Sequence, residues 1–331
     1  MPMLKELLIY ETDCTDPWHN LATEKYLMDS LVPGQAILYL WQNQNTVVIG
    51  RNQNPWAECR VSLLEQEGGK LARRLSGGGA VFHDLGNLNF TFLMSDEDYD
   101  IPRQLSVIQC ACALLGIDAQ PSGRNDLLAE GAKFSGNAFY HSQGRAYHHG
   151  TLLINADMDK LGRYLSPPKA KLDAKGVQSV RSRVVNLSQL RPGLTVPAMK
   201  DAMKQAFSQV YRLSPTALSL DAGALERIEA DARANGDWQW LFGSKLPFSF
   251  QCETRFSWGC FQLQLDTESG AIRSVRVYTD AMDWQLPAAI EAALTGCHFG
   301  TEDMCRAICG ASGLTQEVQR DLCNLIREQE L

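Results

Sequence analysis

Apolar positions recur with a helical period in several separate stretches of the chain. The first stretch follows Asp16-Pro17, which supplies an N-cap and a first-turn proline, and it ends at Pro33-Gly34. The same spacing predicts further helices over residues 61–68, 106–117, 158–165, 196–211 and 223–235. Helices are therefore expected along most of the chain.

Shorter runs between these helices are rich in β-branched and aromatic residues and predict strands. Residues 36–50 hold two such runs around a polar Asn/Gln segment, and residues 132–155 hold two around a Gly-containing turn, so each predicts a hairpin. Further strands are predicted at residues 70–74, 80–84 and 87–94. Because strands and helices do not alternate strictly, we expect an α+β fold with a mixed or antiparallel sheet and flanking helices.

The composition changes after Lys245-Leu246-Pro247, which we interpret as a linker. Beyond it, two alternating strands surround the turn Glu268-Ser269-Gly270, and helical stretches follow. The chain is therefore expected to form two domains, residues 1–245 and residues 253–331, the second a small α+β accessory domain.

The overall composition is that of a soluble globular protein, with 45% hydrophobic and 21% charged residues among 331. No apolar stretch approaches the ~20 residues that a membrane span requires, and acidic residues follow the N-terminus too closely for a secretory signal. We therefore expect a cytoplasmic protein with no membrane partner. The formal net charge of −7 would repel phosphates, so a nucleic-acid partner is not expected either.

Ten cysteines are scattered along the chain. Cys110 and Cys112 are too close for an ordinary disulfide, and Cys305 and Cys309 have helical spacing. No Cys-x-x-Cys pair occurs, which excludes a zinc ribbon. Reduced thiols in a cytosolic protein are the expected state.

Three consecutive glycines interrupt the predicted strands in RRLSGGGAVFHDLGN, residues 73–87. This stretch matches neither the P-loop nor the dinucleotide-binding pattern, because its glycines lie between two strands. On spacing alone, a bulged hairpin turn is the simpler interpretation. The neighbouring Arg73, Arg74 and Ser76 favour an anion-binding loop instead, because glycine amides and arginine donors bind phosphate or carboxylate.

Polar side chains gather on the hairpin predicted over residues 132–155. Strand alternation groups Lys133, Ser135 and Asn137 on one face of its first arm. On its second arm, alternation groups Tyr147, His149 and Thr151. If the two faces coincide they form one polar cluster, and otherwise they are solvated strand faces.

Three further features give weaker signals. Adjacent His148 and His149 point to opposite faces of a strand, so they cannot chelate one metal ion together. Asp126 in SGRND could hold Mg²⁺ beside Asn125, although Asn-Asp is also ordinary turn chemistry. Residues 169–183 carry five basic residues against one acidic residue, which fits either a solvated loop or a flap that meets anionic groups.

Six stretches of the chain form one combination of motifs: LYLWQNQNTVVIGRNQNPW, RRLSGGGAVFHDLGN, SGRNDL, KFSGNAF, HHGTLL and AKGVQSVRSRVVNL. In this order they closely resemble the lipoate–protein ligase A family in its bacterial two-domain form. The resemblance covers essentially all of the first expected domain and continues more weakly into the second. The combination is far more specific than the glycines alone.

The resemblance implies a biotin/lipoate ligase catalytic fold and a reaction in two steps. Lipoate, or octanoate, and ATP with Mg²⁺ give the acyl-AMP and pyrophosphate. The acyl group then passes to a lysine of an apo lipoyl domain of a 2-oxo acid dehydrogenase acyltransferase subunit, or of the glycine-cleavage H protein. No tightly bound organic cofactor is implied.

The resemblance also implies two sets of site residues. The set for ATP and the acyl-adenylate is Arg74, Ser76, Gly77, Gly78, Gly79, Ala80, Val81, Phe82, Asn87, Asn125, Asp126, Lys133 and Lys175. The set for lipoate is Trp41, Arg74, Gly79, Lys133, Ser135, Gly136, His149, Gly150 and Thr151. Residues 169–183 match a loop that closes over the adenylate.

Lys133 is the expected catalytic residue. Its ammonium would stabilise charge on the carboxylate and the α-phosphate without a covalent intermediate. Asp126 is the candidate metal ligand. The connection between Asp126 and Lys133 is shorter than in some members of the family, which affects the expected shape of the nucleotide side of the site.

Three alternatives remain open on the sequence. The first is a lipoyl- or octanoyltransferase that uses a preformed acyl donor, although no cysteine lies between Cys112 and Cys252 to serve a cysteine-based version. The second is a non-catalytic scaffold that binds lipoate or its carrier domain, and the third is a biotin ligase. Pyrophosphate release that depends on ATP separates the ligase from the transferase and the scaffold.

Overall fold

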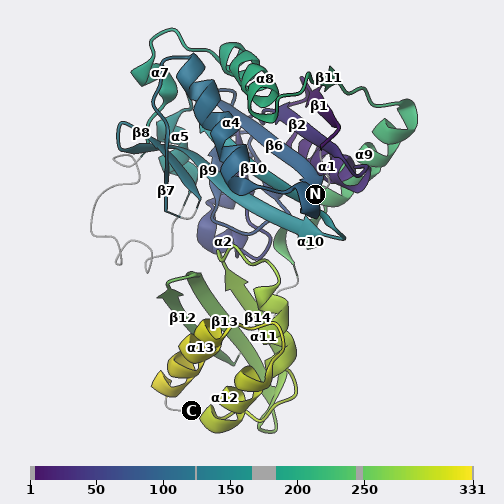
Figure 1. The fold of residues 1–331 in the computed structure, drawn as a ribbon. Coiled ribbons are helices and arrows are strands. Elements are labelled where there is room, and N and C mark those ends of the chain that lie inside the picture. Colours follow the sequence, from purple (N-terminus) through teal and green to yellow (C-terminus); the bar gives the residue numbers. More distant parts are fainter. Residues whose placement is uncertain (1–3, 124, 166–183, 244–248, 330–331) are drawn as a thin grey trace.

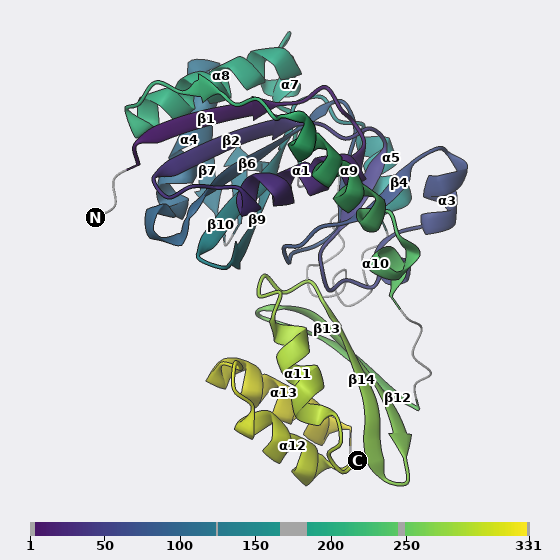
Figure 2. The same ribbon diagram turned by 90° about the vertical axis from the view of Figure 1, so that its right-hand side faces the viewer.

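The computed structural model describes residues 4–123, 125–165, 184–243 and 249–329. Within these ranges the elements form two groups with separate hydrophobic cores (Figure 1). The larger, N-terminal group ends with helix α10 (Trp238–Phe242), and the C-terminal group begins with strand β12 (Phe250–Phe256). In both views the C-terminal group lies against one side of the larger group (Figure 2).

An eight-stranded sheet, in the order β11-β1-β2-β6-β10-β9-β8-β7, organises the larger group. Strand β1 pairs in parallel with both of its neighbours, and the other pairings of this sheet are antiparallel, so the expectation of a mixed sheet is confirmed. Its strands are β1 (Glu6–Glu11), β2 (Gln35–Trp41), β6 (Asn87–Ser95), β7 (Gln120–Ser122), β8 (Asp126–Ala129), β9 (Ala132–Ser142), β10 (Arg145–Leu153) and β11 (Thr216–Ala217).

Helices cover both faces of this sheet (Figure 2). Helices α4 (Ile101–Leu114) and α8 (Val196–Tyr211) pack on one face, and α1 (Pro17–Asp29) packs on the other. Successive residues of β2 belong to the two cores, Leu38 to the first and Tyr39 to the second, because strand side chains alternate between faces. The sheet is therefore buried on both sides, as its apolar strands require.

The helices predicted from apolar spacing are all present. Helix α4 begins five residues earlier than predicted, because Asp100 accepts a hydrogen bond from the Arg103 amide as its N-cap. None of the helices in the described ranges is long and apolar enough to cross a membrane. The remaining helices of this group are α2 (Pro55–Glu58), α3 (Val61–Gln66), α5 (Met158–Tyr164), α7 (Leu187–Leu190), α9 (Ala222–Asn235) and the 3₁₀ helix η1 (Asp96–Asp98).

A second sheet of three strands corrects two expectations. Strand β3 (Thr46–Ile49) lies at its centre, parallel to β4 (Lys70–Arg73) and antiparallel to β5 (Val81–His83). The predicted hairpin over residues 36–50 is wrong, because β2 and β3 belong to different sheets and the buried β3 finds its partners in β4 and β5. The bulged-hairpin interpretation of the glycine loop is also wrong, because β4 and β5 pair with β3 and not with each other.

The C-terminal group is a three-stranded antiparallel sheet, β12-β13-β14, covered on one face by helices. The predicted turn joins β13 to β14 with Ser269 and Gly270 at φ +52° and +81°, the geometry of a tight hairpin. The small α+β group is therefore confirmed, with β12 as an additional strand. Its other elements are β13 (Gly259–Glu268), β14 (Ala271–Thr279), α11 (Leu286–Leu294), α12 (Thr301–Gly310) and α13 (Gln316–Glu328).

Candidate active site

A cavity of about 410 Å³ lies where three parts of the chain meet. The eight-stranded sheet supplies one wall through β2, β6, β9 and β10, and the glycine loop between β4 and β5 supplies a second. The third wall comes from the C-terminal group, from residues 255–259 and 280–282. A volume of this size matches that of small-molecule sites in proteins.

Most of the residues expected from the sequence line this cavity. They are Trp41, Arg74, Gly78, Gly79, Ala80, Val81, Asn125, Asp126, Lys133, Gly136, His149, Gly150 and Thr151. Five others do not line it, namely Ser76, Gly77, Phe82, Asn87 and Ser135. The whole basic stretch 169–183, including Lys175, lies outside the described residues.

The residues that do not line the cavity are buried behind it. Phe82 packs against Tyr164 in the core below the small sheet, at a centroid distance of 5.4 Å. Asn87 donates a hydrogen bond to the Asn89 side chain at 2.8 Å. Ser135 is 1% exposed. In this structure these positions therefore lie behind the cavity wall.

The side chain of Arg74 contacts the backbone of the glycine loop. Arg74 donates from Nη2 to the carbonyls of Gly77 (2.7 Å) and Gly79 (2.8 Å), so its guanidinium holds the glycine loop in shape. Burial lowers the pKa of Arg74 to about 10, opposed by Tyr147 and Glu24, so the side chain stays cationic at neutral pH. This places a positive charge directly beneath the loop.

Lys133 carries a second positive charge at the cavity. Its Nζ lies 2.6 Å from Oδ1 of Asp126, and both side chains are about one-third exposed, at 35% and 36%. A register shift in the β8–β9 pairing, opposite the step from Lys133 to Ser135, accompanies this contact. The Lys133 ammonium is therefore paired with a carboxylate and is also accessible from the cavity.

Asp126 is the expected Mg²⁺ ligand, and its observed contact is the Lys133 ammonium. No group of three or more His, Cys, Asp or Glu side chains within the described ranges is arranged to hold a metal ion. A single carboxylate still fits the chemistry of Mg²⁺, which keeps several waters and is commonly held by one or two carboxylates together with substrate phosphates.

The two polar faces of the β9–β10 hairpin do not coincide in the strand register, although Lys133, Asn137, His149 and Thr151 all line the cavity. His149 lies opposite Ala138, and Asn137 lies opposite Gly150, so the His149 and Asn137 side chains are on different faces. Asn137 instead accepts at Oδ1 from Nε2 of His148, at 2.8 Å. The expectation that His148 and His149 point to opposite faces is confirmed.

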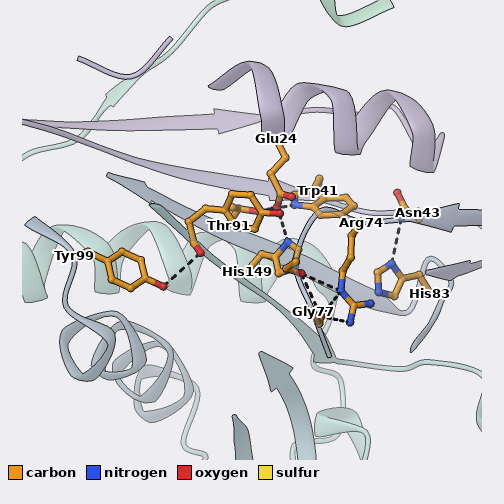
Figure 3. A network of polar contacts seen from close by, with 11 residues as sticks. Glu24, Trp41, Asn43, Arg74, Gly77, His83, Thr91, Tyr99 and His149 are labelled. Atoms are coloured by element: carbon orange, nitrogen blue, oxygen red, sulfur yellow. Dashed lines mark hydrogen bonds and ion pairs between the residues drawn. The ribbon is translucent and has the colours of Figure 1, made fainter. Parts of the chain in front are cut away.

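His149 belongs to a buried network that begins on helix α1 (Figure 3). Its Nδ1 lies 2.8 Å from Oε1 of Glu24, and its Nε2 lies 2.8 Å from Oγ of Ser76. Thr91 donates to the same Glu24 oxygen at 2.7 Å, and Trp41 donates to Thr91 at 3.1 Å. Glu24 was not among the expected site residues, although a glutamate on the apolar face of a predicted helix was an available signal.

His83 is a second residue of the site that was not among the expected site residues. It lines the cavity, and its Nδ1 lies 3.2 Å from the Asn43 side-chain amide. Burial, together with Arg74 and His149, lowers the pKa of His83 to about 3, so the ring is neutral at physiological pH.

The C-terminal wall of the cavity was not expected from the sequence. Arg255, Trp258, Asp280 and Met282 all line it. The Gly78 amide donates to the Ala281 carbonyl at 3.3 Å, so the glycine loop contacts this wall directly. These residues form no recognisable motif, and only the tertiary structure brings them to the site.

Two family matches agree with this arrangement. Residues 16–208 match the family described as lipoyl protein ligase A/B catalytic domain, and residues 245–326 match the bacterial lipoate protein ligase C-terminus. The chain therefore belongs to the lipoyl protein ligase A/B family.

Its relatives include two proteins named lipoate–protein ligase A. The protein of Psychrobacter cryohalolentis is 43% identical over 307 residues, which cover 90% of this chain and 91% of the relative. The protein of Blochmanniella pennsylvanica is 44% identical over 280 residues, which cover 82% of this chain and 83% of the relative. The resemblance seen in the motifs thus extends over nearly the whole chain.

Solved structures with similar folds include three ligases. The structure of P. falciparum LipL1 in complex with lipoate has a TM-score of 0.84 at 25% identity and covers 98% of this chain and 99% of that one. A lipoate–protein ligase A bound with ATP has a TM-score of 0.61 at 27% identity, with 73% and 99% covered. The bipartite ligase of Thermoplasma acidophilum, solved with its E2 lipoyl domain, has a TM-score of 0.62 at 27% identity, with 75% and 100% covered.

Proposed function

We infer that this chain is an ATP-dependent lipoate–protein ligase. It activates lipoate to lipoyl-AMP with release of pyrophosphate and then transfers the lipoyl group to a lysine of an apo lipoyl domain. The observation that carries this inference is a single cavity that joins apolar residues, including Leu21, Trp41 and Val48, to the charged side chains of Arg74 and Lys133. Such a cavity suits an apolar acyl chain with an anionic end.

Lys133 is proposed to stabilise charge during adenylation. The carboxylate of lipoate and the α-phosphate of ATP repel each other, and an ammonium between them offsets that repulsion and the charge that develops on the phosphoryl oxygens. Before the substrates bind, the Lys133 ammonium is paired with the Asp126 carboxylate. The lysine would exchange this partner for the substrate oxygens and would form no covalent bond.

The remaining substrate and carrier assignments are proposals supported by family membership. Octanoate is proposed as a second acyl substrate, and the glycine-cleavage H protein as a second carrier. Mg²⁺ is proposed to accompany ATP, with Asp126 as the carboxylate that reaches it. Chelation with EDTA should stop pyrophosphate release, and added Mg²⁺ should restore it.

The location and the domain boundaries are also proposals. No disulfide joins any of the ten cysteines, and thiols persist in reducing compartments, so a cytoplasmic location is proposed. The separate cores of the two groups support domains at residues 1–245 and 253–331.

Mass spectrometry of an apo lipoyl domain tests the proposed function. After incubation with the chain, ATP, Mg²⁺ and lipoate, the domain should gain the mass of one lipoyl group, and omission of ATP should prevent the gain. A gain from a preformed acyl donor alone would indicate a transferase, and no gain at all would leave a binding scaffold. Inhibition of lipoate transfer by free biotin would point to a biotin ligase.

Substitution of Lys133 by alanine should remove adenylation and spare the fold. We expect the rate of pyrophosphate release to fall about 10²–10³-fold, because one preorganised charge at the reacting centre is lost. Lys25→Ala is the matched control, since it breaks an exposed Lys–Asp pair of 2.8 Å on helix α1. Near-normal pyrophosphate release by the Lys133 variant would contradict the assignment.

A further inference from the structure

Glu24 lies outside every motif that the sequence analysis singled out, yet hydrogen bonds join it through two other residues to Arg74 (Figure 3). We propose that Glu24 is a positioning residue that acts through His149 and Ser76 to fix the orientation of Arg74, and with it the glycine loop against which the acyl-adenylate binds. This inference rests on the proposed function and adds a residue to the same site.

An unbroken series of hydrogen bonds connects the two charged side chains. Glu24 Oε1 lies 2.8 Å from His149 Nδ1, and His149 Nε2 lies 2.8 Å from Ser76 Oγ. Arg74 Nε then donates to Ser76 Oγ at 3.1 Å. Each of these side chains is more than nine-tenths buried, so water does not compete for the bonds.

The chemistry of the groups gives the series one direction. Thr91 accepts from Trp41 and donates to Glu24, whose carboxylate can only accept. His149 therefore donates from Nδ1 to Glu24. In the proposed series His149 Nε2 accepts the Ser76 hydroxyl proton, and the Ser76 oxygen accepts from Arg74 Nε.

The series also balances charge inside the protein. Arg74 is 6% exposed, and its other hydrogen bonds go to backbone carbonyls, which carry no net charge. Glu24 is 2% exposed and carries the matching negative charge, with the His149 imidazole and the Ser76 hydroxyl between the two. A buried ion without an opposite charge is unfavourable, so the pair stabilises the charged form of Arg74.

The orientation of Arg74 matters because the same guanidinium holds the glycine loop. Its Nη2 binds the carbonyls of Gly77 and Gly79 on either side of Gly78, which has φ +87°. A rotated guanidinium would release both carbonyls and change the cavity wall. Glu24, on helix α1, thus controls the shape of a loop that it does not touch.

A double-mutant cycle tests this proposal. Glu24→Gln keeps the size and an acceptor oxygen but removes the charge, and Ser76→Ala removes the link between His149 and Arg74. We expect Glu24→Gln to slow pyrophosphate release about tenfold or more in the native background, and by less than about threefold when Ser76 is already alanine. Equal losses in both backgrounds would overturn the proposal, because Glu24 would then act independently of Ser76.

Nitrogen-15 NMR of His149 gives a second readout that does not depend on activity or on the variants folding. The unsubstituted protein should show a proton on Nδ1 and none on Nε2, and a proton on Nε2 would overturn the proposal.

Glu65→Gln, at an exposed position on α3, serves as the control for the kinetic measurements on the Glu24 and Ser76 variants. If the unsubstituted chain releases no pyrophosphate, the proposed ligase function fails, whereas the His149 spectrum still tests the hydrogen-bond series itself.

Discussion

Arg73 and Arg74 show how neighbouring residues of one motif acquire different roles. Arg73 donates to the carbonyls of Arg51 and Gln53 at 2.8 Å each and also reaches the Trp240 carbonyl at 2.9 Å. It therefore joins β4 to the loop after β3 and to α10. Only Arg74 lines the cavity, because adjacent strand residues point to opposite sides.

Gly77 offers a test of the contact between the glycine loop and the C-terminal group. A Cβ at this position would lie 2.3 Å from the Ala281 carbonyl oxygen and 2.8 Å from that of Met282, so backbone atoms would have to move. We expect Gly77→Ala to destabilise the contact by about 1–3 kcal/mol. Hydrogen exchange at residues 279–284 should accelerate, and pyrophosphate release should fall.

Gly162→Ala on α5 is the control for this substitution. Its added Cβ meets no atom within 4 Å, and alanine in a helix stabilises by roughly 0.5–1 kcal/mol relative to glycine. Unchanged exchange at residues 279–284 in the Gly77 variant would show that the loop and the C-terminal wall do not support each other.

Helix α1 connects the two sheets of the larger group at the scale of elements. Its N-cap, Asp16, accepts from the amides of Trp18 and His19 and pairs with Lys70 on β4. The Trp18 indole donates to the Leu71 carbonyl at 2.9 Å. The helix that carries Glu24 is thereby held against the small sheet that carries the glycine loop.

Substitution of Asp16 should show this connection in the stability of the chain. Asp16→Ala should lower the free energy of unfolding by about 1 kcal/mol through loss of the N-cap, whereas Asp16→Asn should retain most of it, because Asn caps as well as Asp. Urea denaturation of both variants at pH 7 measures the difference. Equal losses would assign the effect to the Lys70 pair and not to the cap.

The same residue predicts a pH dependence. Burial by itself raises the pKa of Asp16, but the Lys70 ammonium and the His19 and Trp18 amides outweigh it, so the net pKa is lowered. The unfolded value is about 4. The charge-dependent stabilisation is therefore present above about pH 4 and is lost as the pH falls through the folded-state pKa. In Asp16→Asn this acid-dependent loss should be smaller. Urea titrations from about pH 3 to about pH 6 would measure the difference.

At the scale of the whole molecule, residues 279–284 of the C-terminal group contact the larger group. The Asn52 side chain donates to the Trp284 carbonyl at 2.7 Å, and the Thr279 amide donates to the Asn52 carbonyl at 3.0 Å. The Trp284 ring lies 5.2 Å from that of Tyr140 and 4.7 Å from the Arg51 guanidinium. The cavity wall from residues 280–282 thus depends on contacts at both of its ends.

Trp284→Ala should loosen this attachment. Loss of an aromatic pair and a cation–π contact should destabilise it by about 1–2 kcal/mol, and the radius of gyration from small-angle scattering should increase. Trp238→Ala is the control, because this tryptophan is 49% exposed and packs on Phe242 within the larger group. An identical response of the two variants would argue against a specific role for the segment.

Elements whose contacts are local could be predicted from the sequence. Helix α8 was predicted at the observed residues, and the β9–β10 hairpin was predicted from its two runs and its turn, because apolar spacing and turn residues act over a few positions. Resemblance of motifs also led to Lys133 and Arg74. These residues lie within short stretches that carry the signal themselves.

The tertiary structure alone decided which separate stretches meet. The partners of β3, the register that puts His149 opposite Ala138, and the C-terminal wall of the cavity all depend on pairings between distant segments. Glu24 and His149 are 125 residues apart in the sequence and 2.8 Å apart in the structure. The spacing of apolar residues and a sequence motif both depend on residues that are near in the sequence. The position of a buried charged side chain depends on a partner that can be distant in the sequence.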